Sequence, residues 1–299
     1  MRIVFMGTPE FAINPLKVLI DSEHEIVSVF TNPDKQQGRG RKVLPSPVKG
    51  LALQHGLRVE QPASLKSPEI GDKIKSLAPD FIVVVAYGKI LPKEILEIPK
   101  FGAVNIHASL LPKYRGPAPI QWALINGDKK TGVATMLMDE GIDTGDIIMQ
   151  KGIEIDEKIM VSDLFSKLSE AGAKLLIPSL EKLVKGEKTL KQEGEASYAP
   201  MITKETTRLD FNKTGDEIIN LVRGLSGYLT AYFEQNDERI KVFSASKSEE
   251  KRLSEYKNGD VIKGEKLLVA ASDSVISLDE IQIPGGKRMD SGAFLRGRR

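Results

Sequence analysis

Asn105 and His107 are the pair whose residue types and spacing best suit chemistry in this chain of 299 residues. They close a short apolar run, and because side chains alternate along a strand, the two project from the same face. An amide and an imidazole that point together can hold an oxyanion and move a proton. The alternative is that both side chains only satisfy backbone groups of the following loop, as polar residues at strand ends commonly do. The pair alone leaves both hypotheses open.

A second polar segment, residues 138–146, follows another predicted strand and carries four acidic residues among glycines. Its spacing does not match a calcium-binding loop, since no closing glutamate stands where that loop requires one. A loop that presents one carboxylate beside an imidazole is the better functional interpretation. A solvated turn is the simpler interpretation for the other three acids.

The composition limits the kinds of site that the chain can form. It contains no cysteine, which excludes disulfides, thiolate metal sites and a cysteine nucleophile. Its three histidines, at positions 24, 55 and 107, are too few and too scattered for a histidine-based zinc site, so we expect no metal. The first predicted strand ends with one glycine, Gly7, where a dinucleotide fingerprint has three, and no phosphate-cradling G-x-x-x-x-G-K-[ST] motif occurs. Binding of NAD or ATP in the usual way is therefore not expected.

The elements that must position these residues alternate between strands and helices over the first half of the chain. This alternation predicts an α/β fold with a Rossmann-like, doubly wound and mostly parallel sheet. We expect strands at 2–6, 25–31, 81–86, 103–107 and 131–138. We expect helices at 9–21, 46–56, 67–77, 118–126 and 162–185, with an irregular segment between 31 and 46.

The second half has a different pattern. A stretch rich in Lys, Glu, Gly and Ser predicts a linker at 190–205, between domains at 1–189 and 206–299. After a helix at 216–224, five short alternating runs predict a small β-barrel or sandwich, at 230–234, 240–245, 260–263, 266–270 and 275–283.

The string Asn-x-His-x-Ser-Leu-Leu-Pro-x-x-Arg-Gly at 105–116, followed by Asp-x-Gly-x-Asp-Thr-Gly at 139–145, resembles the formyltransferases that use 10-formyltetrahydrofolate. Further strings at 5–12, 30–34, 38–49 and 84–88 are similar to the members of that family that act on methionyl-tRNA. The resemblance covers residues 1–205 continuously and extends more loosely to the C-terminus. It departs at 225–231, where the chain reads Leu-Ser-Gly-Tyr-Leu-Thr-Ala in place of the family's Asn-Pro-Trp-Pro-Gly-Ala.

The resemblance implies a catalytic set of Asn105, His107 and Asp143. In this set Asn105 and a protonated His107 donate to the oxyanion of a tetrahedral intermediate, while Asp143 holds His107 and helps to move the proton. It also implies 10-formyltetrahydrofolate as the formyl-donor cosubstrate. The folate-binding residues would be Ser109, Leu110, Leu111, Pro112, Val85, Ala86, Asp139, Gly141 and Ile142. For the C-terminal domain it implies a small barrel of the OB-fold type, a common nucleic-acid scaffold.

Positive charge is concentrated between residues 35 and 59. The whole chain has 43 Lys and Arg against 41 Asp and Glu, yet this segment has six basic residues and no acidic one. A solvated face is one interpretation of such a run. The resemblance implies instead a flexible loop that contacts the acceptor end of a tRNA, where basic side chains would meet backbone phosphates. The implied contacts are Lys35, Arg39, Arg41, Lys42 and Lys49, with Arg39 as the main one.

The predicted function is transfer of a formyl group from 10-formyltetrahydrofolate to the α-amino group of initiator methionyl-tRNA. One alternative is a related transferase that acts on an amino sugar or a glycinamide ribonucleotide, and another is a non-catalytic RNA-binding relative. We expect a cytoplasmic monomer that does not associate with membranes, since the N-terminal apolar run is too short for a signal peptide. The longest apolar run, at 81–87, is about a third of a bilayer span.

Overall fold

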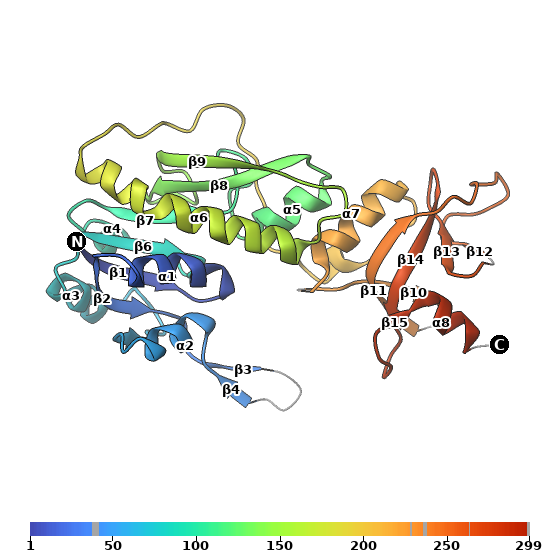
Figure 1. Ribbon diagram of the computed structural model, residues 1–299, viewed down its shortest axis with the longest axis horizontal. Helices are drawn as coiled ribbons and strands as arrows, with labels where there is room; N and C mark the ends of the chain where they lie inside the picture. The colour runs from blue at the N-terminus through green and yellow to red at the C-terminus, as the bar shows by residue number, and fades with distance from the viewer. Residues whose placement is uncertain (38–41, 228, 236–237, 263, 298–299) are drawn as a thin grey trace. The chain divides into compact units, whose positions relative to one another are not determined.

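The computed structural model describes residues 1–37, 42–227, 229–235, 238–262 and 264–297, which form two compact units (Figure 1). Unit 1 consists of Met1–Pro117, Gly132–Ile153 and Phe165–Ala199. Unit 2 consists of Ala118–Thr131, Glu154–Leu164 and Pro200–Arg299. The domain boundaries expected at 189 and 206 stay a prediction. Two segments from the middle of the chain, Ala118–Thr131 and Glu154–Leu164, belong to the same unit as the C-terminal residues.

A seven-stranded sheet forms the centre of unit 1. Its order is β5 (Val59–Glu60), β2 (Glu25–Phe30), β1 (Arg2–Gly7), β6 (Phe81–Val85), β7 (Ala103–His107), β8 (Lys130–Leu137) and β9 (Ile147–Glu154). The pairings from β5 to β7 are parallel, and β8 runs antiparallel to β7. All five residues of β6 are buried, as expected for a central strand covered on both faces. The predicted doubly wound, mostly parallel sheet is confirmed.

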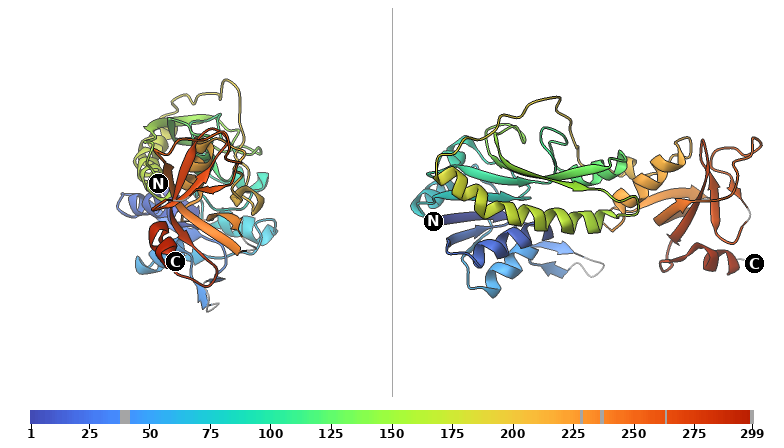
Figure 2. Two further views of the ribbon diagram at one scale, coloured as in Figure 1. Left: turned by 90° about the vertical axis from the view of Figure 1, so that its right-hand side faces the viewer. Right: turned by 45° about the horizontal axis from the view of Figure 1, so that its top comes forward.

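Helices flank this sheet, and the longest of them packs closely against it. The helices are η1 (Glu10–Ala12), α1 (Ile13–Ile20), α2 (Pro47–Gln54), α3 (Pro68–Ser76), α4 (Lys93–Leu96) and α6 (Val161–Val184). A Cβ at Gly172 of α6 would lie 2.7 Å from a methyl of Ile106 in β7, so glycine permits the close approach. The right-hand view of Figure 2 shows α6 lying along the sheet. The segment expected to be irregular contains a hairpin of β3 (Lys35–Gln37) and β4 (Lys42–Leu44).

Unit 2 is built on an antiparallel sheet with strands in the order β10 (Ala231–Gln235), β11 (Glu238–Lys247), β14 (Val275–Gln282), β13 (Leu267–Ala270) and β12 (Val261–Ile262). A short strand, β15 (Met289–Asp290), pairs with β14. The helices of the unit are α5 (Pro119–Ile125), η2 (Glu205–Thr207), α7 (Gly215–Leu225) and α8 (Ser291–Arg296). This curled sheet confirms the prediction of a small barrel-like domain in the C-terminal part.

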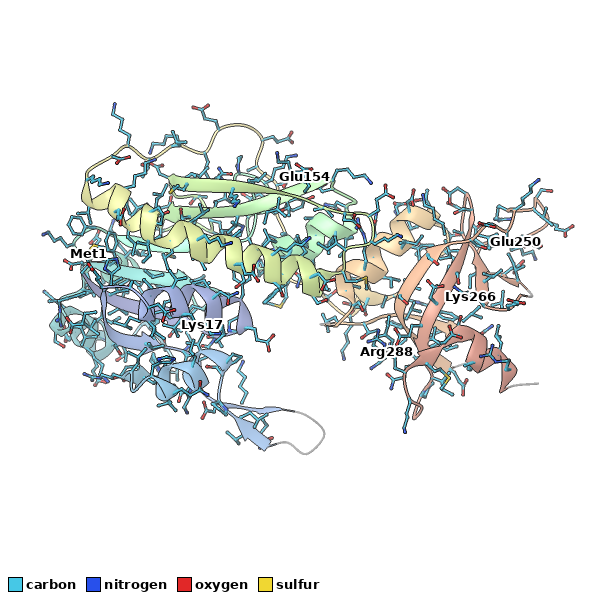
Figure 3. The ribbon with its side chains drawn as sticks, in the orientation of Figure 1. Met1, Lys17, Glu154, Glu250, Lys266 and Arg288 are labelled. Atoms are coloured by element: carbon cyan, nitrogen blue, oxygen red, sulfur yellow. The ribbon has the colours of Figure 1, made fainter. Side chains whose placement is uncertain are left out.

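The core of unit 2 forms where α7 packs on the sheet. Ile218, Val222 and Leu225 are buried among strand residues such as Ile240 and Val242. Trp122 and Ile125 of α5 pack against the same cluster. Charged side chains line the strand surfaces, where Lys266 pairs with Asp279 at 3.1 Å and Arg288 pairs with Glu280 (Figure 3).

Within the described ranges, no helix combines the length and apolarity that crossing a membrane requires.

Candidate active site

Asn105 and His107 lie in β7, an interior strand of the unit 1 sheet between β6 and β8. The two residues are 9% and 6% exposed, and their spacing of two positions places their side chains on one face of the strand. Polar groups buried this deeply need partners. Both find one in the loop that follows β8.

Asp143 supplies that partner. Its Oδ2 atom accepts a hydrogen bond of 2.8 Å from the backbone N–H of Gly116 and lies 3.5 Å from Nδ1 of His107. Its Oδ1 atom is 3.4 Å from Nδ2 of Asn105. The structure therefore brings Asn105, His107 and Asp143 together around one carboxylate.

The second ring nitrogen of His107 also faces an oxygen. Nε2 lies 2.8 Å from the carbonyl oxygen of Tyr114, and a carbonyl can only accept, so Nε2 carries the hydrogen. Oxygen atoms therefore lie on both sides of the ring, the Tyr114 carbonyl at Nε2 and the Asp143 carboxylate at Nδ1. To donate to a substrate oxygen, the ring would exchange the Tyr114 carbonyl for that oxygen.

The loop that carries Asp143 is tightly wound. Asp139 accepts hydrogen bonds from the backbone of Gly141 (3.0 Å) and from the hydroxyl of Thr144 (2.6 Å), which makes it a turn-forming residue. A Cβ at Gly145 would lie 1.8 Å from the carbonyl oxygen of Leu137, so only glycine fits there. Asp143 itself has a φ of +53°, a left-handed conformation that non-glycine residues adopt at a cost.

The predicted folate-binding residues divide into buried and exposed groups. Ser109, Leu111 and Val85 are buried, and the Ser109 hydroxyl donates to the carbonyl of Lys113 at 2.5 Å. Leu110 packs against Gly132 of β8, and Pro112 and Asp139 lie in the two loops beside β7 and β8. Ala86, Gly141 and Ile142 are exposed, and the Ile142 side chain is 61% accessible. Among the described residues, no cluster of His, Asp and Glu could hold a metal ion.

The predicted tRNA contacts lie around the β3–β4 hairpin. Lys35 is exposed in β3, and Lys42 stands in β4 opposite Gln37. Arg39 and Arg41 lie outside the described residues. Lys49 is half-buried and its ammonium lies 2.5 Å from Asp34, where its hydrogen bond, together with one from Gln61, holds the pKa of the Asp34 carboxyl below its usual value. In this structure Lys49 therefore anchors the base of the basic segment.

Gln192 is a residue at the site that no sequence pattern indicated. It lies in the predicted linker, yet its amide contacts the carbonyls of Asp143 and Gly145. A single glutamine in a stretch of polar residues has no periodicity or motif that marks it, so only the folded chain reveals this contact.

Models of two families match the chain. The model described as "Formyl transferase" matches residues 1–180, and "Formyl transferase, C-terminal domain" matches residues 201–299. The chain belongs to the formyl transferase family. A methionyl-tRNA formyltransferase of Clostridioides difficile (strain 630) is 46% identical over 299 residues, covering 99% of this chain and 97% of that relative. The resemblance noted in the sequence is confirmed.

Solved structures show the same fold at lower identity. WlaRD, a sugar 3N-formyl transferase solved in the presence of dTDP and 5-N-formyl-THF, matches with a TM-score of 0.69 and 21% identity, over 96% of this chain and 99% of that chain. A methionyl-tRNA formyltransferase from Clostridium thermocellum matches with a TM-score of 0.59 and 22% identity, over 95% and 98%. Both matches support the assignment of the fold.

Proposed function

We propose that this chain transfers the formyl group of 10-formyltetrahydrofolate to the α-amino group of initiator methionyl-tRNA. The observation that carries the proposal is the Asp143 carboxylate, which contacts the N–H of Gly116 and lies beside Asn105 and His107. The similarity to a methionyl-tRNA formyltransferase over nearly the whole chain supports the choice of acceptor. The folate derivative in the WlaRD structure supports the choice of donor.

The reaction needs a site for negative charge and a path for one proton. The amine nitrogen attacks the formyl carbon, and the carbonyl electron pair moves onto oxygen. Nδ2 of Asn105 and the ring of His107 supply the N–H groups that can stabilise this oxyanion. Asp143 accepts the proton that the attacking nitrogen loses and delivers it to N10 of the folate as the carbon–N10 bond breaks. The products are the N-formylated amine and tetrahydrofolate, with no net gain or loss of a proton.

The substrates would approach different parts of unit 1. Exposed apolar groups at Ala86 and Ile142 are proposed to contact the folate ring, and the buried Leu111 to support the loop behind it. The basic segment that includes Lys35 is proposed to meet tRNA phosphates. A cytoplasmic location follows from this role in translation initiation.

A formyl-transfer assay tests the proposal. The protein is given 10-formyltetrahydrofolate with charged initiator methionyl-tRNA, charged elongator methionyl-tRNA, free methionine, an amino sugar nucleotide or glycinamide ribonucleotide. We expect transfer to the initiator tRNA at a kcat/KM at least about 100-fold above that for the small acceptors. Preferred transfer to the sugar or the ribonucleotide would support the related transferases instead. Binding of tRNA without any transfer would support a non-catalytic relative.

A further inference from the structure

The Gln192 side chain uses all of its hydrogen-bonding capacity at the edge of the site. Its Nε2 atom donates to the carbonyl oxygens of Asp143 at 2.9 Å and Gly145 at 2.8 Å. Its Oε1 atom accepts from Nε and Nη2 of Arg115, at 3.1 and 2.8 Å. One amide thus joins the loop that carries Asp143 to the loop that carries Gly116, whose N–H donates to the Asp143 carboxylate.

The chain on either side of Gln192 fastens the same two loops. Before it, Leu190 exchanges two backbone hydrogen bonds of 2.8 Å with Ile147, just after the Asp143 loop. After it, the Ser197 hydroxyl accepts from the backbone N–H of Tyr114 at 2.9 Å, and the Ser197 carbonyl accepts from that of Arg115 at 2.9 Å. Residues 190–199 therefore form a strap over unit 1, and Gln192 lies between its two attachment points.

Asp143 needs such support because of its backbone conformation. A non-glycine residue with a φ of +53° persists only where its surroundings hold it there. Gln192 binds the carbonyl of that same residue and the carbonyl two positions later. The direction of the Asp143 carboxylate toward Gly116 and His107 depends on this backbone.

We propose that Gln192 is a positioning residue for formyl transfer, which sets the orientation of the Asp143 carboxylate through the backbone of its loop. The inference rests on the proposed function, in which Asp143 moves the proton. Gln192 is not expected to touch either substrate. Its loss should therefore lower kcat and leave KM for the folate and for the tRNA nearly unchanged.

The test compares four single variants and one double variant of the full chain. Gln192→Ala removes all the hydrogen bonds of the amide, whereas Gln192→Glu keeps an oxygen toward Arg115 and turns a second oxygen toward the two carbonyls. Glu193→Ala changes an exposed neighbour on the same strap and serves as the matched control. Asp143→Asn provides the background for a double-mutant cycle with Gln192→Ala.

We expect both Gln192 variants to lower kcat by about 10- to 100-fold, the range expected when a catalytic group is displaced by about 1 Å. In both variants, the KM values for the folate and for the tRNA should change by less than about twofold. The thermal midpoint of Gln192→Glu should stay near that of Glu193→Ala. The control Glu193→Ala should keep full activity. In the Asp143→Asn background, Gln192→Ala should lower the single-turnover rate no further, because Gln192 acts through Asp143.

Three outcomes would overturn the inference: a kcat within twofold of the unaltered protein for both Gln192 variants, an equal loss in the two backgrounds, or a loss confined to KM. Normal turnover by Asp143→Asn would instead contradict the proposed function. The two failures are therefore distinguishable.

Discussion

At the scale of single residues, the Asp143 carboxylate connects the polar groups of the site. It contacts a backbone N–H of one loop and lies within 3.5 Å of both polar side chains of β7. An acceptor placed between two donors can hold their orientation and pass on a proton. The chemistry proposed for the chain depends on this one side chain more than on any other.

Asp143→Asn should lower the rate of formyl transfer by about 100- to 10,000-fold, since an amide cannot accept the migrating proton. Binding of folate and of tRNA should persist, because the change is nearly isosteric. Single-turnover kinetics together with equilibrium binding of each substrate would check this.

His107→Asn should lower the rate of formyl transfer to a similar degree. Turnover near the normal rate in either variant would remove that residue from the proposed chemistry.

The sequence predicted part of this site, for a physical reason. Asn105 and His107 lie two positions apart in one strand, so the alternation of side chains already places them together. Asp143 comes from a different loop, and only the family resemblance indicated which of the four acids it would be. Gln192 lies far along the chain from the loops that it joins, and local patterns contain no information on such a contact.

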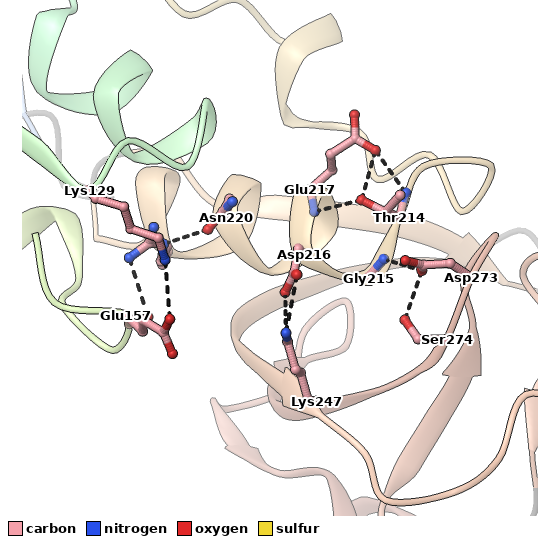
Figure 4. Close-up of polar contacts among 11 residues, drawn as sticks. Lys129, Glu157, Thr214, Gly215, Asp216, Glu217, Asn220, Lys247, Asp273 and Ser274 are labelled. Atoms are coloured by element: carbon pink, nitrogen blue, oxygen red, sulfur yellow. Dashed lines mark hydrogen bonds and ion pairs between the residues drawn. The ribbon is translucent and has the colours of Figure 1, made fainter.

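At the scale of elements, the N-terminus of α7 shows how unit 2 fixes its main helix (Figure 4). Thr214 and Glu217 form a reciprocal capping box, with hydrogen bonds of 2.9 and 3.2 Å. Asp273, from the turn before β14, accepts from the N–H of Gly215 at 2.8 Å. A carboxylate at a helix N-terminus is also favoured by the helix dipole.

Asp273→Asn should therefore destabilise the protein in a pH-dependent way. The hydrogen bond from Gly215 lowers the pKa of Asp273 in the folded state, so its stabilising effect is present above the unfolded pKa of about 3.9 and is lost as the pH falls through the folded pKa. Denaturant midpoints at pH 7 should be lower for the variant. The difference should shrink as the pH falls through the folded pKa, and a gap that stays constant as the pH is lowered from 7 until the protein unfolds would contradict this account. Glu249→Gln, at an exposed position, is the control.

The β3–β4 hairpin leads to a prediction about tRNA. Replacement of Lys35 and Arg39 with Ala should raise KM for the tRNA and leave KM for the folate unchanged, because phosphate contacts contribute to only one substrate. The effect should shrink as salt is raised toward about 0.2 M, because a variant with fewer phosphate contacts has a shallower salt dependence. Lys66→Ala removes an exposed charge elsewhere and should change neither value. An equal rise in KM for the tRNA and for the folate would show that the hairpin is not a tRNA-binding element.

Elements with a clear hydrophobic pattern in the sequence were predicted well, and elements without such a pattern were not. Each residue of β6 is apolar, and the strand was expected within one residue of its observed end. The edge strand β9 was missed, since only its first two residues are buried and it contains a lysine and a glycine. The β3–β4 hairpin was missed because its strands are only three residues long and the apolar residues of β4, Val43 and Leu44, are exposed and form no alternating pattern.

At the scale of the whole molecule, the chain passes repeatedly between the two units. Residues 118–131 and 154–164 belong to unit 2, although they lie within the stretch predicted as the first domain. In unit 2, Trp122 and Ile125 pack against the cluster that contains Val222 of α7. A cut in the predicted linker would therefore remove the residues against which Trp122 and Ile125 pack.

A fragment of residues 1–199 should show this loss directly. Trp122 is the single tryptophan of the chain, and its Nε1 atom donates to the carbonyl of Pro200 in the intact protein at 2.8 Å. We expect red-shifted emission, binding of a hydrophobic dye and aggregation of the fragment at micromolar concentration. A monomeric fragment with unchanged emission that binds no dye would show that α5 does not depend on the C-terminal segment.

Because residues 118–131 belong to the same unit as the C-terminal residues, they are synthesised well before most of that unit. Helix α5 ends at Ile125 and α7 begins at Gly215, about 90 residues later. At about 5 to 20 residues per second, the ribosome needs roughly 5 to 20 s to supply the second helix after the first. During that time Trp122 and Ile125 lack the α7 side chains that share their cluster in the folded chain, so this part of the core can form only late in synthesis.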